Sequence, residues 1–438
     1  RNRSGATLTV NGGTISSVSG TALNSAGTLI VNGGTFTTDG GGQAATLTGN
    51  STITGGKFIT NTSATSTASN AITAMVGELT IKGGTFEAGK QAIAASAGAT
   101  VIIEGGDFSV RSYAGGNILY GDQAKIIVSG GTFKAPNSDT VEAVNVTASG
   151  SAEISGGEFS VPVSEELLKD GFALSYDSQN NTFAPEEGTV FAHVDRDGKT
   201  YAFTQPAYAI SFAEEGETVV IDVSFKINGS IVINKGINLD LNGHTITGTS
   251  ENYATVQVNG LVKGQGFAVE IFSSVEGGKI VSENCIAVWA LRDANVTLSD
   301  IELKGANGAD VGYNGEAYDA SLTLNNVAVT ATAEEGYGIG VWGNNNDTLS
   351  PVTLIANNST ITAPVYAISG NGLYHNTYIE LNNCNITATL GDPETPDFDN
   401  LSTGIFHPQE GELFINGGFV TGVGAAVEIR SGSLTVTG

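Results

Sequence analysis

A short phrase, a glycine pair followed by a polar residue and a large apolar residue, recurs through the first part of this chain. Counted from the residue before each pair, the repeats begin at Asn11, Asn32, Thr54, Lys82, Glu104, Ser129 and Ser155. The large apolar residues that follow are Ile15, Phe36, Phe58, Phe86, Phe108, Phe133 and Phe159. A period of about 20–30 residues, made of short β-branched strands and glycine turns, is typical of a solenoid.

The same frame continues in the second half, where Asn-Asn or Asn-Gly often replaces the glycine pair. These units lead from Asn242 to Ile246, Glu276 to Ile280, Ser299 to Leu303, Asn325 to Val329, Asn357 to Ile361, Asn382 to Ile386 and Asn416 to Val420. Helical periodicity and leucine-rich spacing are both missing, which excludes those two solenoid classes. The sequence therefore predicts an all-β, right-handed parallel β-helix with about three short strands per coil.

Backbone geometry explains the recurring phrase. Each coil must turn sharply between two sheets, and Gly or Asn tolerates the positive φ that such a corner needs. The Phe or Ile that follows is expected to point inward and to stack on its equivalents in neighbouring coils. The amides of Asn325, Asn357, Asn382 and Asn416 are expected to form a hydrogen-bonded ladder. The phrase thus predicts a corner and a core stack, rather than a ligand site.

The repeat stops between Ser155 and Asn242, and this gap marks a domain boundary. Ser164 and two acidic residues predict a short helix that ends before Gly171. Hairpins are expected around Asn180-Asn181 and Asp197-Gly198, and a short amphipathic helix within 203–221 is expected to cap the next coil stack. We place a first β-helix at residues 1–187 and a second at 188–438.

Two segments resemble known modules. Residues 198–221 with 237–248 resemble the entry segment of pectate-lyase-like right-handed β-helices, and residues 154–185 resemble the closing segment of glycine-pair repeat modules. Both kinds of module occur in very large, adhesin-like surface proteins of gut bacteria. The resemblance implies an extracellular location at the bacterial cell surface and a fragment of a larger secreted protein. Relatives in this broad group include polysaccharide lyases, hydrolases, adhesins and antibody-binding proteins.

Charge and cysteine content exclude several function classes. The net charge of −26 argues against nucleic acid and anionic membranes as partners. No apolar run reaches the length of a membrane span, so this fragment is not expected to insert into a membrane. Cys285 and Cys384 are expected to be free thiols, with one long-range disulfide as the alternative. No Cys/His grouping has metal-site spacing, and no cofactor is expected.

An enzymatic site is not evident in the sequence. Pectate-type lyases need carboxylates on adjacent coils and a nearby base, and hydrolases need two carboxylates that flank the scissile bond. No Asp-Asp pair occurs, and Arg292 beside Asp293 predicts a surface ion pair. His375 and His407 have no carboxylate at a recognisable spacing. No catalytic residue is assigned, although a polysaccharide lyase or glycoside hydrolase stays open as an alternative.

Aromatic residues gather on one strand of each coil in the second half. Strand alternation directs Val256, Val288, Ile339, Ile368, Ile405 and Val427 inward and the residues one and three positions later outward. Tyr253, Tyr337 and Tyr366, which precede this column, are expected to face outward as well. The candidate binding residues are Tyr253, Trp289, Tyr337, Trp342, Tyr366, Tyr374, His375, Tyr378, Phe406 and His407. Exposed aromatics on a rigid sheet suit sugar stacking or a protein hot spot. The alternative is that inserts such as 391–400 fold back and bury them.

These observations predict a non-catalytic, adhesin-like extracellular module. Its aromatic face would bind a host or microbial macromolecule, either a protein such as an immunoglobulin or a glycan. A lyase or hydrolase of the pectate-lyase-like kind stays open, and so does a structural spacer.

Overall fold

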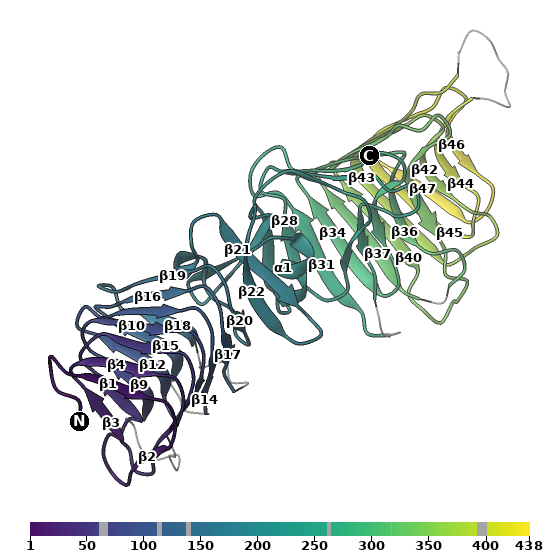
Figure 1. Cartoon of the computed structure of the whole chain (residues 1–438). Coiled ribbons are helices and arrows are strands. Elements are labelled where there is room, and N and C mark those ends of the chain that lie inside the picture. The colour runs from purple at the N-terminus through teal and green to yellow at the C-terminus, as the bar shows by residue number, and fades with distance from the viewer. Residues whose placement is uncertain (61–68, 112–115, 137–141, 261–263, 317, 392–400) are drawn as a thin grey trace. The chain divides into compact units, whose positions relative to one another are not determined.

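The chain forms a parallel β-solenoid of about 16 turns (Figure 1). The computed structural model describes residues 1–60, 69–111, 116–136, 142–260, 264–316, 318–391 and 401–438. Two compact units are present: Arg1–Val190 with Asp195–Ser211, and Phe191–Val194 with Phe212–Gly438. The predicted all-β parallel β-helix is confirmed, while its right-handedness and its division into two β-helices remain predictions. None of the described helices is both long and apolar enough to cross a membrane.

Three parallel sheets build the coils of the first unit, and each coil contributes one strand to each sheet except the last, which has none in the third. The first sheet contains β1 (Thr7–Val10), β4 (Thr28–Val31), β7 (Ser51–Ile53), β10 (Glu78–Ile81), β13 (Thr100–Ile103), β16 (Lys125–Val128) and β19 (Ser151–Ile154). The second contains β2 (Thr14–Ser17), β5 (Thr35–Thr38), β8 (Lys57–Thr60), β11 (Thr85–Ala88), β14 (Asp107–Val110), β17 (Thr132–Lys134) and β20 (Glu158–Phe159). The third contains β3 (Leu23–Ser25), β6 (Ala45–Leu47), β9 (Asn70–Ala74), β12 (Gln91–Ser96), β15 (Asn117–Asp122) and β18 (Glu142–Val146).

The glycine pair forms the corner between the first two sheets. At Gly106, φ is 117°, a value that side-chain-bearing residues rarely adopt. The preceding Gly105 packs so closely on the previous coil that an added Cβ would lie 2.9 Å from the carbonyl oxygen of Lys82. One glycine therefore supplies the left-handed conformation and the other permits the close approach, which confirms the predicted corner.

The phenylalanines of the repeat form one continuous interior stack. Phe36, Phe58, Phe86, Phe108, Phe133 and Phe159 are almost fully buried. Consecutive ring centroids lie between 4.5 and 5.2 Å apart, and the rings are within 9° of parallel. The distance between ring centroids is close to the spacing of neighbouring strands, so the distance between successive coils sets the stacking distance of the rings.

A closing segment covers the last coil of the first unit. It consists of the one-turn 3-10 helix η1 (Glu165–Leu167) and the antiparallel hairpin β21 (Phe172–Asp177) and β22 (Thr182–Glu187). The predicted helix from Ser164 to Gly171 is wrong beyond this single turn. Leu168 is extended and forms a parallel bridge with Ile154, so continuing the coil stack prevails over local helix propensity. Ser164 makes no capping bond to the backbone.

The segment that follows contains the other predicted elements. Strands β23 (Ala192–Arg196) and β24 (Lys199–Phe203) flank a two-residue turn with positive φ at Asp197 and Gly198. The helix α1 (Pro206–Phe212) precedes β25 (Thr218–Ile221), as the sequence predicts.

The second unit repeats the three-sheet arrangement. One sheet contains β25, β28 (Asn238–Asp240), β31 (Phe267–Phe272), β34 (Ala294–Ser299), β37 (Ala320–Asn325), β40 (Val352–Asn357), β43 (Thr377–Ala388), β45 (Gly411–Thr421) and β47 (Ser433–Thr437). The next contains β26 (Phe225–Ile227), β29 (Thr245–Gly248), β32 (Lys279–Ser282), β35 (Glu302–Gly305), β38 (Ala328–Ala331) and β41 (Thr360–Ala363), and it continues into the second halves of β43 and β45.

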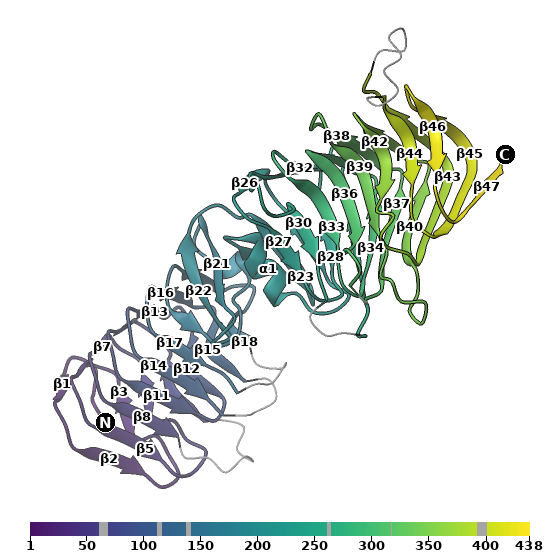
Figure 2. The same cartoon turned by 90° about the vertical axis from the view of Figure 1, so that its right-hand side faces the viewer.

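The third sheet of this unit has eight strands that follow one another along the coil stack (Figure 2). They are β27 (Ile231–Ile233), β30 (Val256–Val258), β33 (Ile286–Ala290), β36 (Asn307–Gly312), β39 (Tyr337–Trp342), β42 (Tyr366–Gly370), β44 (Thr403–His407) and β46 (Ala425–Ile429).

Asparagine takes the place of the glycine corner in this unit. The side-chain amide of Asn357 donates to Oδ1 of Asn325, Asn382 donates to Asn357, and Asn416 donates to Asn382, each at 2.9 Å. The next residues along, Asn326, Asn358 and Asn383, have positive φ. The predicted asparagine ladder is therefore confirmed, and it links four successive coils at the same corner.

The phenylalanine stack makes a testable contribution to stability. We expect Phe108→Ala to lower the free energy of unfolding by about 3–5 kcal/mol, because it removes a buried ring and leaves a cavity between two stacked neighbours. Chemical denaturation followed by circular dichroism would measure the change. Ser109→Ala, at the adjacent outward-facing position, is the control and should cost less than about 1 kcal/mol. A similar loss in both variants would contradict the role assigned to the stack.

Candidate binding face

The sheet from β27 to β46 carries the predicted aromatic rows, together with one row that the sequence pattern does not reveal. Strand β36 lies between β33 and β39 and pairs with both of them. The inward column therefore includes Ala309 between Val288 and Ile339. In the outward column, Asp310 is the register partner of Trp289 on one side and of Gly340 on the other.

Most of the candidate residues keep part of their surface accessible. Trp289, Tyr337, Trp342, Tyr366, Tyr374, His375, Tyr378 and Phe406 are half-buried, and Tyr253 is 57% exposed. The alternative prediction is that the insert at 391–400 buries these residues. Most of this insert lies outside the described residues.

His407 differs from the other candidates because its side chain is completely buried. Burial lowers the pKa of this imidazole. Neither ring nitrogen has a hydrogen-bond partner among the described residues, and the same is true of both side-chain polar atoms of the nearby Gln409. His407 therefore belongs to the interior, and we remove it from the set of surface residues.

A first aromatic cluster surrounds Trp289. The indole Nε1 donates to the carbonyl oxygen of Gly312 at 2.9 Å, and the ring centroid lies 5.6 Å from that of Tyr313. The Arg292 guanidinium lies 5.9 Å from the ring centre of Tyr313. It also forms a two-pronged ion pair with Glu316, with N–O distances of 2.6 and 3.0 Å. These contacts hold the indole and the guanidinium in fixed positions.

The predicted ion pair between Arg292 and Asp293 is wrong. Asp293 is buried and has positive φ, and its carboxylate accepts hydrogen bonds from the backbone amides of Gly264 and Asp319. Adjacent residues on a coil point in different directions, which leaves Arg292 free to pair with the next coil.

A second cluster extends from Trp342 to Phe406. Trp342 packs edge to face against Tyr337, with centroids 5.8 Å apart, and Tyr337 is the register partner of Tyr366. Tyr366 stacks on Phe406 at 5.0 Å, and the Arg430 guanidinium lies 4.8 Å from the Phe406 ring centre. We refer to this cluster and the Trp289 cluster together as the aromatic face.

A buried carboxyl group lies beneath the aromatic face. Asp310 is 3% exposed, and its Oδ2 accepts a hydrogen bond from the Tyr337 hydroxyl at 3.2 Å. A Cβ at Gly340 would lie 2.4 Å from Oδ1 of Asp310 and 2.7 Å from Cζ2 of Trp342, so glycine is required for both to fit. Desolvation raises the pKa of Asp310 to about 7, and hydrogen bonds offset this only in part.

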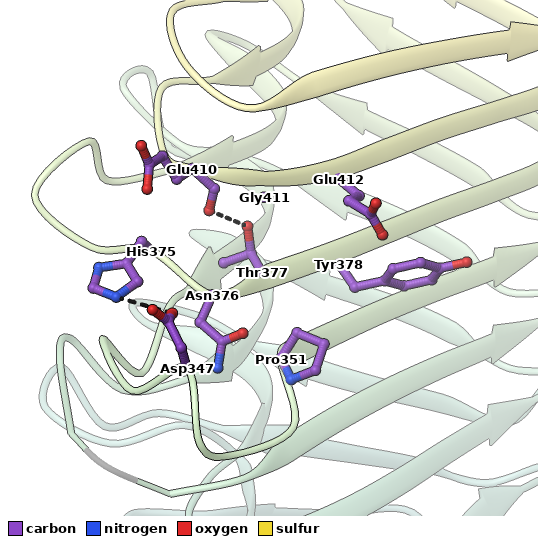
Figure 3. Close-up of a pocket in the computed structure, with 9 residues that line it drawn as sticks. All are labelled: Asp347, Pro351, His375, Asn376, Thr377, Tyr378, Glu410, Gly411 and Glu412. Carbon is purple, nitrogen blue, oxygen red and sulfur yellow. Dashed lines mark hydrogen bonds and ion pairs between the residues drawn. The ribbon is translucent and has the colours of Figure 1, made fainter.

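A pocket of about 290 Å³ opens where strands of this sheet end (Figure 3). Its wall comes from the loops that follow β39, β42 and β44 in three successive coils, and from the first residues of β43 and β45. The lining residues are Asp347, Pro351, His375, Asn376, Thr377, Tyr378, Glu410, Gly411 and Glu412. Thr377 and Gly411 are register partners, and so are Tyr378 and Glu412.

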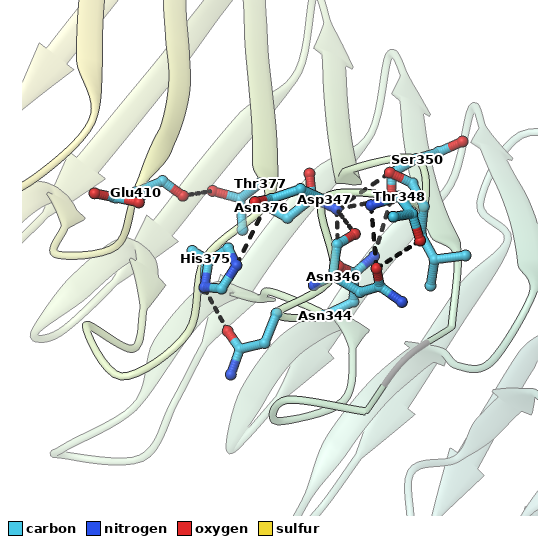
Figure 4. Close-up of polar contacts among 11 residues, drawn as sticks. Asn344, Asn346, Asp347, Thr348, Ser350, His375, Asn376, Thr377 and Glu410 are labelled. Atoms are coloured by element: carbon cyan, nitrogen blue, oxygen red, sulfur yellow. Dashed lines mark hydrogen bonds and ion pairs between the residues drawn. The ribbon is translucent and has the colours of Figure 1, made fainter.

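Asparagine side chains hold the pocket loops in place (Figure 4). The amide of Asn376 donates to Oδ1 of Asn344 and to the carbonyl oxygen of Asn346, both at 2.8 Å. The backbone amide of His375 donates to Oδ1 of Asn345 at 2.7 Å. His375 Nε2 lies 3.3 Å from Oδ1 of Asp347, a partner that sequence spacing does not indicate. The loops are therefore ordered by bonds between neighbouring coils.

Tyr378 connects the pocket to the adjacent strand. Its hydroxyl donates to Oε2 of Glu380 at 2.7 Å, and this bond raises the pKa of the phenol. The ring lies 5.5 Å from that of Phe414. Tyr378 thus presents a fixed aromatic ring beside the carboxylate of Glu412.

The two cysteines of the chain do not form a disulfide. Cys285 is half-buried, Cys384 is buried, and both are free thiols. Within the described ranges, no group of three or more His, Cys, Asp or Glu side chains is arranged to hold a metal ion.

Comparison with known proteins gives no assignment, since no family model, curated protein or solved structure matches the chain. Any conclusion about function therefore depends on the sequence and the geometry of the chain itself.

The buried carboxyl group predicts a pH-dependent effect on stability. Because the folded-state pKa of Asp310 lies above the ordinary value, the folded state holds an extra proton between about pH 4 and 7, and stability falls as pH rises through this window. We expect the free energy of unfolding of Asp310→Asn to rise relative to that of the parent between about pH 4 and 7, by about 1.4 kcal/mol per pH unit at most. Above this window the difference should stay constant. Urea titrations at several pH values would measure this.

The exposed Glu334→Gln serves as the control for that titration, and its difference from the parent should stay small at every pH. A constant difference for Asp310→Asn from pH 4 to pH 8 would show that Asp310 does not carry the effect.

Proposed function

We propose that this chain is a non-catalytic, extracellular binding module of a bacterial surface protein, and that the aromatic face is its binding site. The observation that carries the proposal is the row of half-buried aromatic side chains on the outer face of one sheet. Each is held by ring contacts, and several by hydrogen bonds or a neighbouring guanidinium. The extracellular and bacterial parts of the proposal rest on the resemblance in sequence.

A protein partner, such as an immunoglobulin, suits this arrangement best. Trp, Tyr and Arg are the residues most enriched at binding hot spots, and both clusters combine aromatic rings with an arginine. Side chains that are already fixed lose little conformational entropy when a partner binds. The Tyr337 hydroxyl also donates to the buried carboxylate of Asp310, which helps to fix the ring in place.

A glycan is the second candidate, and the surroundings of Tyr378 favour it. A half-buried ring beside the carboxylates of Glu380 and Glu412 offers a stacking surface and hydrogen-bond acceptors for sugar hydroxyl groups. The test of a partner must therefore include glycans as well as proteins.

The lyase or hydrolase alternative has a direct test. We expect no unsaturated or hydrolysed product when the chain is incubated with polygalacturonate and a panel of other polysaccharides in the presence of calcium. Product formation, measured by ultraviolet absorbance and reducing-end assays, would overturn the non-catalytic proposal.

The aromatic face can be tested by substitution. The immobilised chain is offered serum proteins, mucus proteins and a glycan array, and a captured partner is then measured by biolayer interferometry. We expect Trp289→Ala with Trp342→Ala to weaken binding at least tenfold, since truncating a hot-spot aromatic costs about 2 kcal/mol or more.

Val18→Ala with Val76→Ala removes two exposed apolar side chains from the first unit and serves as the matched control. This variant should bind as the parent does. Unchanged affinity in the tryptophan variant, or capture of no partner from any source, would remove the support for this face.

A further inference from the structure

We infer that the aromatic face and the pocket at its edge form a docking surface for a basic protein segment, with a Lys or Arg side chain of the partner entering the pocket. The inference rests on the proposed function, because it names the chemistry of the partner that the same face would bind. The inference is supported by charge complementarity and by the position of the pocket beside the aromatic face.

The charge balance around this surface is strongly one-sided. Within the described residues 305–316, 318–391 and 401–438 there are ten Asp and Glu residues, and Arg430 is the single Lys or Arg. Its guanidinium already pairs with Glu428 at 2.8 Å and lies over Phe406. No lysine or arginine of this part of the chain is therefore left to neutralise the pocket, and a cationic partner would be steered toward it.

The carboxylates of the pocket are open to a partner. Asp347, Glu410 and Glu412 all line the cavity, and all three are exposed. Asp347 pairs with His375, the one basic side chain among the lining residues. Within the described part of the chain, no ion pair is formed by Glu410 or Glu412. A protonated amine or guanidinium entering the cavity would meet these carboxylates directly.

The shape of the pocket suits one side chain rather than an extended ligand. Its volume of about 290 Å³ lies at the lower end for small-molecule sites. Figure 3 shows His375 and Glu410 on one side of Thr377, and Tyr378 and Glu412 on the other. A cation on the Tyr378 side would meet the Glu412 carboxylate beside the aromatic ring, and contact of a cation with such a ring is favourable.

The pocket and the aromatic face are continuous along the chain. Trp342 ends β39 and the loop with Asp347 follows, while Phe406 is next to the end of β44 and Glu410 follows. A partner lying over the aromatic rings would thus reach the pocket with an adjacent basic side chain. Anionic glycans would be repelled at the same place, so the charges distinguish partners that the aromatic rings alone accept.

The experiment measures binding of tetralysine to the whole chain by isothermal titration calorimetry at low salt, with tetraglutamate as the charge-reversed peptide. Glu410→Gln with Glu412→Gln removes two pocket charges. The matched control, Glu334→Gln with Glu335→Gln, removes two exposed charges from the loop at the opposite end of β39. That strand has six residues and is about 20 Å long.

We expect tetralysine to bind the parent and the control within about twofold of each other, and the pocket variant about tenfold more weakly. Added salt should weaken binding to the parent, and tetraglutamate should not bind. Equal tetralysine affinity for the parent, the pocket variant and the control would mean that the peptide binds through the overall negative charge of the protein, and this result would overturn the inference. No binding of tetralysine, or a preference for tetraglutamate, would also overturn it.

The same variants separate this inference from the proposed function. A captured partner that is lost with Trp289→Ala and Trp342→Ala, but unaffected by Glu410→Gln and Glu412→Gln, would leave the aromatic face as the binding site and exclude the basic docking group.

Discussion

In-register parallel pairing between successive coils is the constraint on which the rest of this molecule depends. Because neighbouring strands lie about 4.8 Å apart, every side chain is placed next to its equivalent in the coils before and after it. The stacked phenylalanines, the asparagine ladder and the aromatic face are three results of this single rule. A residue type that stacks well is stabilised by repetition. A buried ionisable group is penalised instead, and desolvation raises the pKa of Asp310 to about 7 despite its hydrogen bond from Tyr337.

Much of the fold follows from the sequence because the corner and the core have strict chemical requirements. The residues after each turn, from Ile246 through Ile280 and Leu303 to Val420, lie in register as the spacing predicts. The helix after Ser164 could not be predicted correctly, because a long-range bridge between Leu168 and Ile154 decides its conformation. The β36 row is hard to recognise in the sequence because it carries Asp310 where its neighbours carry aromatic residues or glycine, and so resembles none of them.

The sequence predicts the candidate site less completely than it predicts the fold. The outward aromatic rows can be predicted from alternation, but the pocket depends on three loops whose lengths bring Asp347, His375 and Glu410 together. His375 and Asp347 are 28 residues apart, and only the path of the coil makes them neighbours. The run from Asn344 to Asn346 is the available signal, since asparagines order turns and precede the carboxylate directly.

The tight glycine corner also has a consequence for how this architecture can change. A methyl group at Gly105 would lie 2.9 Å from the carbonyl oxygen of Lys82 in the preceding coil, so substitution there is disfavoured. The loops that follow the strands of the third sheet differ in length from one coil to the next, although single glycines within them, such as Gly343, are also closely packed. The corner therefore keeps one length from coil to coil, whereas the loops vary in length, so insertions that alter the surface are accommodated in the loops.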